Sequence, residues 1–110
     1  MRMADQIAFL KARLDETQRL AQAYLDHAAA RKRPGPERWA YQLLLREIEA
    51  KRAIIERYER ACAVPESAVS FTAGQDDGYR QACMDVIRDF AAIYSDHPGY
   101  RPEWAVSHDY

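Results

Sequence analysis

The long stretch from residue 36 to residue 62, PERWAYQLLLREIEAKRAIIERYERAC, constrains the fold more than any other part of the sequence. On a helix, which turns about 100° per residue, its apolar side chains fall into two separate stripes. The first stripe contains Tyr41, Leu44, Leu45, Ile48, Ile55, Tyr58 and Cys62, and the second contains Trp39, Leu43, Ala50, Ile54 and Ala61. Because a helix that rests on one surface needs a single stripe, this pattern predicts a central helix packed between two neighbours.

The flanking residues supply the two neighbours. Residues 4–31 place apolar side chains at three- and four-residue steps with no glycine or proline among them, which predicts a second long helix. The RPGP link at 33–36 breaks this helix and turns the chain, so the two helices are expected to form an antiparallel hairpin. Residues 74–96 are predicted as a third helix, because Thr72 and Gln75 have capping-box spacing before it. Its apolar stripe consists of Tyr79, Cys83, Val86, Phe90 and Ile93. The fold predicted is all-α, with this helix packed beside the hairpin.

The remaining residues, 97–110, are predicted to form an aromatic tail that returns to the hairpin. Pro98 disfavours helix at the residue before it, so the third helix must stop there. Pro98 and Gly99 suit the two central positions of a type II turn. The rings of Tyr100 and Trp104 are costly to leave in water, so the tail is expected to fold back and cover them.

Composition is typical of a soluble globular protein. The 110 residues suit a single domain over 1–110, and 48% of them are hydrophobic and 30% charged, as in chains that fold around their own core. No apolar run is long enough to span a bilayer, and charge occurs too early at the N-terminus for a secretory signal peptide. We therefore expect a cytoplasmic protein in which Cys62 and Cys83 stay free and buried.

Arg31, Lys32, Arg33 and Arg38 form the basic cluster of the sequence, at the expected tip of the hairpin. They could contact the phosphates of a nucleic acid, or they could be solvated cations that stabilise a helix end. The isoelectric point of about 6.3 is far below that of a typical nucleic-acid-binding domain, which favours the second interpretation. A nucleic-acid-associated regulator is kept as the alternative function.

Asp96 and His97 are the pair that most invites a catalytic interpretation, since a histidine beside an acid can move protons. The sequence offers them no evident nucleophile, no glycine-rich phosphate loop and no second clustered histidine. We interpret the pair as residues that end a helix and turn the chain. No catalytic residue, metal or cofactor is expected, and the chain is not expected to be an enzyme.

Three stretches resemble a known family: FLKARLDE at 9–16, LLREIEAKRAIIERYE in the middle and IYSDHPGYRPEW at 93–104. They are similar to small actinobacterial and actinophage proteins of unknown function with a terminal YxDHPxYRxEW motif, and the resemblance covers residues 7–104. Many of those proteins carry a histidine and cysteines in a pattern that looks like a zinc site. Here Tyr58 stands in place of the histidine, and the loop after Cys62 has no further cysteine. The resemblance therefore implies a compact unit of phage or actinobacterial origin without a metal.

Together these observations predict a non-enzymatic interaction module that binds a protein partner or a second copy of itself. Its helices carry more apolar surface than a minimal bundle needs. Phe9 and Leu20 lie off the main stripe of the first helix, which favours self-association through that helix. The candidate interaction motif of the tail comprises Asp96, His97, Pro98, Tyr100, Arg101 and Trp104.

Overall fold

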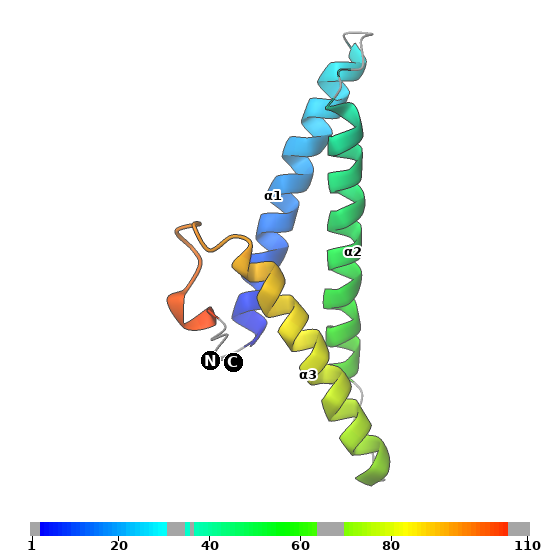
Figure 1. The fold of residues 1–110 in the computed structure, drawn as a ribbon, viewed down its shortest axis with the longest axis vertical. Coiled ribbons are helices and arrows are strands. Elements are labelled where there is room, and N and C mark those ends of the chain that lie inside the picture. The colour runs from blue at the N-terminus through cyan, green and yellow to red at the C-terminus, as the bar shows by residue number, and fades with distance from the viewer. Residues whose placement is uncertain (1–2, 31–34, 36, 64–69, 106–110) are drawn as a thin grey trace.

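The computed structural model describes residues 3–30, 35, 37–63 and 70–105, and within 70–76 it describes the backbone alone. These residues form three α-helices and one short 3-10 helix, with no strand among them (Figure 1). The elements are α1 (Met3–Ala30), α2 (Arg38–Ala63), α3 (Ser70–Ala92) and η1 (Pro102–Trp104). The predicted all-α fold is confirmed. None of the described helices combines the length and apolar character needed to cross a membrane.

α1 and α2 lie side by side and run in opposite directions, as the predicted hairpin requires (Figure 1). A polar contact joins them near the middle, where Arg52 Nη2 lies 2.7 Å from Asp15 Oδ1. Closer to the tip, the rings of Tyr24 and Tyr41 stack with their centroids 4.0 Å apart, and the Tyr24 hydroxyl donates to Glu37 at 3.0 Å. These contacts fix the register of the two helices where no third helix supports them.

The apolar core lies at the open end of the hairpin, where α3 crosses it and contacts both helices (Figure 1). The side chains of this core cluster are Ile7, Leu10, Leu14, Ile48, Ile55 and Ile87. Towards the tip, none of the described residues in 22–30 or 38–47 is buried. The hairpin is therefore covered at one end and is a bare pair of helices at the other.

The two stripes of α2 have different environments. Ile48 and Ile55 of the first stripe are 1% exposed and form part of the core. In the second stripe, Ile54 packs on the core cluster, but Trp39 is 66% exposed and Ala50 is exposed as well. The predicted position of α2 between two neighbours is therefore correct only for its C-terminal half, because α3 is too short and too oblique to reach the rest.

The boundaries of α3 differ from those expected. The helix begins at Ser70, so Thr72 lies inside it and the capping box proposed there is wrong. It ends at Ala92 rather than at residue 96, because the next N–H groups turn to tighter bonds. Ile93 N–H, for example, donates to the carbonyl of Phe90 three residues before it, at 3.2 Å. Such bonds commonly close the last turn of a helix, and here they aim the chain back towards α1.

Both cysteines are free, as predicted, although only Cys83 is buried and Cys62 is exposed. The predicted single domain over 1–110 stays a prediction. The basic residues 31–33, the connection at 64–69 and the last residues, 106–110, lie outside the described part of the chain.

Candidate functional site: the tail against α1

Phe9 of α1 is the centre of an aromatic cluster that fixes the tail. Four rings from the C-terminal part of the chain surround it, which we call together with Phe9 the aromatic clamp. Their centroids lie 6.5 Å (Tyr94), 5.5 Å (His97), 6.0 Å (Tyr100) and 5.3 Å (Trp104) from that of Phe9. Edge-on and tilted arrangements at these distances are the favourable ones for aromatic pairs. The expectation that the tail folds back over the hairpin agrees with this packing.

The turn before the clamp is tight and depends on a small residue. Tyr100 N–H donates to the His97 carbonyl at 3.0 Å, so His97 to Tyr100 form a turn with Pro98 and Gly99 at its centre. Gly99 lacks the positive φ that a type II turn requires, so the predicted turn type is wrong. The reason for glycine is space: a Cβ at this position would lie 3.2 Å from His97 Nδ1 and 3.3 Å from a Phe9 ring carbon.

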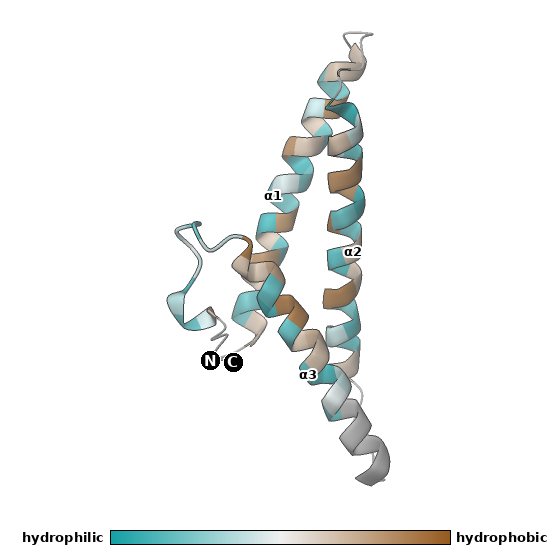
Figure 2. Cartoon of the chain, viewed as in Figure 1, coloured by the Kyte–Doolittle hydropathy of each residue, from teal (hydrophilic) through white to brown (hydrophobic). Residues whose placement is uncertain are grey.

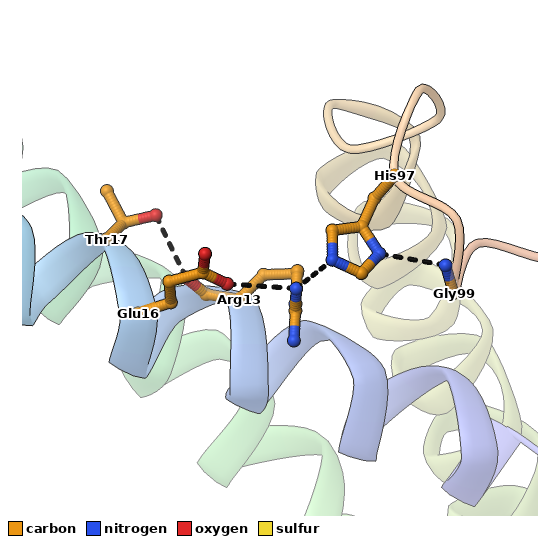
Figure 3. Close-up of polar contacts among 5 residues, drawn as sticks. All are labelled: Arg13, Glu16, Thr17, His97 and Gly99. Atoms are coloured by element: carbon orange, nitrogen blue, oxygen red, sulfur yellow. Dashed lines mark hydrogen bonds and ion pairs between the residues drawn. The ribbon is translucent and has the colours of Figure 1, made fainter.

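The His97 ring lies between its own turn and α1. Gly99 N–H donates to Nδ1 at 2.8 Å, and the Arg13 guanidinium contacts Nε2 (Figure 3). Arg13 is itself oriented by Glu16, whose carboxylate lies 2.9 Å away. Figure 3 shows Arg13 between Glu16 on its own helix and His97 on the tail. Because Nδ1 accepts a hydrogen bond within the turn and the ring packs against Phe9 of α1, His97 links the turn to the first helix.

The end of the tail is anchored by Trp104, which is only 4% exposed. Arg101 lies over its ring at 5.5 Å and reaches Asp5 of α1 at 3.7 Å. The indole Nε1 of Trp104 and the amide nitrogen of Gln6 are buried without a hydrogen-bond partner among the described residues. The contacts of Trp104 with the described residues are therefore packing contacts. Asp96 and Pro98, the other members of the predicted motif, are exposed.

The clamp joins two of the stretches on which the family resemblance depends. Phe9, Arg13 and Glu16 belong to FLKARLDE, and His97 and Trp104 belong to IYSDHPGYRPEW. We predicted from the sequence that the aromatic tail covers the hairpin, but not that it packs around Phe9. The available signal was Phe9, an aromatic residue off the main stripe of its helix, which we had assigned to self-association. Phe9 is covered by the tail and is not free for that role.

The basic cluster is only partly described. Arg38 is exposed at the start of α2 and lines a hollow of about 460 Å³ together with residues of both helices. Asp26 lines the same hollow, so the described surface around Arg38 carries charges of both signs. Of the four predicted cations, Arg31, Lys32 and Arg33 lie outside the described part of the chain.

A second hollow, of about 580 Å³, lies between the start of α1 and the end of α2, and Tyr58 and Cys62 line it. Burial raises the pKa of the Tyr58 hydroxyl, and a hydrogen bond with the Cys62 side chain raises that pKa further. Among the described side chains, no group of three or more His, Cys, Asp or Glu is placed to hold a metal ion. The walls of this hollow are mainly apolar, and Tyr58 and Cys62 form a polar pair within them.

Comparison with known proteins gives a family without an assigned activity. A family model described as a family of unknown function, DUF6221, matches residues 3–106. No curated protein and no solved structure matches the chain. The matched range includes α1, α2, α3 and the whole clamp. The chain therefore belongs to the family of unknown function DUF6221.

Proposed function

We propose that this protein is a non-enzymatic interaction module that binds a protein through the uncovered part of α2. The observation that carries this proposal is a row of apolar side chains along α2 that α3 covers only near Ile54. We call this row, which consists of Trp39, Leu43, Ala50 and Ile54, the α2 seam. Trp39 is 66% exposed, Ala50 is exposed, and Leu43 and Ile54 are half-buried. Apolar segments continue along α2 above the point where α3 meets it (Figure 2).

The exposure of Trp39 needs an explanation because a large aromatic ring is costly to leave in water. Aromatic residues of this size are enriched in the buried centres of interfaces. Contiguous exposed apolar patches on soluble proteins often mark such interaction sites. The clamp at the other end is already filled by the protein's own side chains, so it has no comparable surface to offer a partner.

The test is an affinity capture of the tagged protein from an actinobacterial lysate, analysed by mass spectrometry with and without nuclease. An actinobacterial or actinophage source and a cytoplasmic location remain part of the proposal, and they decide the choice of lysate. The proposal expects a dominant protein that survives nuclease and is lost with Trp39→Ser. Leu20→Ser is the matched control, since Leu20 is 67% exposed but lies on α1. Capture that is unchanged by Trp39→Ser would contradict the proposed surface.

The alternative function, nucleic-acid-associated regulation through Arg31, Lys32, Arg33 and Arg38, makes a different prediction for the same experiment. Recovery would then collapse on nuclease treatment and would weaken steeply with added salt, because phosphate contacts release counterions. Charge reversal at Arg38 would reduce it, and Trp39→Ser would not.

A further inference from the structure

We infer that the α2 seam is the interface of a homodimer, in which two copies of α2 pack antiparallel about a two-fold axis beside Arg46 and Glu47. This inference rests on the proposed function and names the partner at that surface as a second copy of this chain. Three observations carry it: the area that the chain leaves exposed, the symmetry of the seam, and the fit of large side chains opposite small ones.

The chain exposes far more surface than a compact monomer. Its accessible area is 8005 Å², about 1,800 Å² more than the roughly 6,200 Å² expected for a compact protein of 12.7 kDa. Its radius of gyration is 17.6 Å, against roughly 13 Å for a compact domain of this length. A stable dimer typically buries about 800 Å² on each partner. The excess over the whole chain is therefore larger than the area that one partner contributes to such an interface.

The spacing of the seam residues is the same in both directions along α2. Its residues follow at steps of four, seven and four: Trp39, Leu43, Ala50 and Ile54. The centre of this pattern falls between Arg46 and Glu47, which flank the seam on either side and are exposed. A two-fold interface requires a surface that is complementary to itself. An antiparallel pair of such helices meets this requirement, since each seam residue lies opposite another member of the seam.

At the two pairs nearest the two-fold axis, this pairing also matches the sizes of the side chains. Leu43 of one copy lies opposite Ala50 of the other, so a large side chain faces a small one on both sides of the axis. Trp39 lies opposite Ile54, which is half-buried and already packs on the core cluster. Alternation of large and small side chains is what allows two helices to interdigitate. The pairing would extend the covered core of each copy over the bare half of the other hairpin.

The other exposed apolar residues lack this arrangement. Leu20 follows Phe9 by eleven residues and Arg13 by seven along α1, so it lies on the helix face that carries the tail. Ile93 is 61% exposed, directly after the last residue of α3, where the chain turns. Neither belongs to a row that is symmetric along its own helix.

The first experiment measures mass in solution by sedimentation from low to high micromolar concentration. The wild-type chain is expected to move from 12.7 kDa towards twice that mass as concentration rises. Trp39→Ser is expected to remain monomeric over the whole range, whereas Leu20→Ser is expected to follow the wild type. Trp39 emission should shift to the blue as the dimer forms, and Trp39→Phe should lose that shift.

The second experiment tests the antiparallel register by disulfide formation in a Cys62→Ser background, because Cys62 is exposed. A mixture of Leu43→Cys and Ala50→Cys chains should form a covalent dimer under mild oxidation. Each variant alone should not, because equivalent residues would be separated by about 10 Å along the axis, beyond the reach of a disulfide. Covalent dimers from either single variant in as high a yield as from the mixture would overturn this register.

A monomer at every concentration would overturn the inference. If that monomer still captured a protein in a Trp39-dependent manner, the proposed function would stand and only the identity of the partner would be wrong. A monomer that captured nothing would overturn both. A dimer that Trp39→Ser leaves intact would overturn the assignment of the seam.

Discussion

The tryptophans near the two ends of the hairpin differ in how much of the side chain is exposed. Trp104 is 4% exposed and is surrounded by Phe9, Tyr100 and Arg101, whereas Trp39 is 66% exposed on a part of α2 that α3 does not reach. The covered end is completed by the chain's own tail, and the bare end is not. The comparison shows that the chain completes its own packing at one end and leaves a large aromatic side chain exposed at the other.

The largest expected effect separates these two tryptophans directly. Trp104→Ala should lower the free energy of unfolding by about 3–5 kcal/mol, as is usual for removal of a buried large aromatic residue. Trp39→Ala should change the stability of the monomer by less than about 0.5 kcal/mol, as at ordinary surface positions. Urea unfolding followed by circular dichroism, at a concentration where the chain is monomeric, measures both.

Trp104→Phe sharpens this result. It keeps an aromatic ring in the clamp and removes an indole N–H that has no partner in the described part of the chain. Its cost should therefore be well below that of Trp104→Ala. A Trp39→Ala loss as large as that of Trp104→Ala would mean that Trp39 is covered within the monomer, and the contrast between the two ends would be wrong.

A smaller effect is expected at the turn that brings the tail to α1. Gly99→Ala should destabilise the protein by about 1–3 kcal/mol, in the range of other overpacked sites, because the added Cβ would press on His97 and Phe9. The neighbouring substitution Asp96→Ala is the control, since Asp96 is exposed and should change little. Equal stability of the Gly99→Ala variant would show that the clamp can move away from the added methyl group.

Much of the covered end could be predicted from the sequence because local signals agree there. The apolar periodicity of α1 and α2 gave the hairpin, and Pro98 gave the end of α3 to within a turn. The packing of the tail around Phe9 could not be predicted, because a contact between residues far apart in the chain leaves no local pattern. The start of α3 was wrong because a plausible capping box at Thr72 lies within a longer helix.

The bare end shows a different limit of sequence reasoning. The two stripes of α2 correctly indicated two apolar faces, but periodicity does not say what covers each face. We assigned both to neighbours within the chain, and α3 covers only the part of the second stripe near Ile54. The length and crossing direction of α3 decide this, and neither follows from the pattern of α2 alone.

The smallest expected effect concerns Tyr58, at the covered end of the same helix that carries Trp39. Burial and the hydrogen bond with Cys62 raise its pKa, while Arg80 and Arg88 act in the opposite direction. In the unfolded chain this tyrosine loses its proton at a lower pH than in the folded chain. The stability it contributes is therefore complete below about pH 10, the usual tyrosine pKa, and is lost as pH rises through the folded pKa.

Unfolding midpoints measured from pH 8 upward, in steps through about pH 11, test this prediction. The decline in the wild type should be steeper than in Tyr58→Phe, which has no proton to lose at that position. Tyr79→Phe is the matched control, since Tyr79 is 49% exposed, and it should decline as the wild type does. Because Tyr58 lies where α3 covers the hairpin, a Tyr58→Phe decline equal to that of the wild type would show that water reaches this end as freely as it reaches Trp39. The contrast between a covered end and a bare end would then have to rest on the aromatic clamp alone.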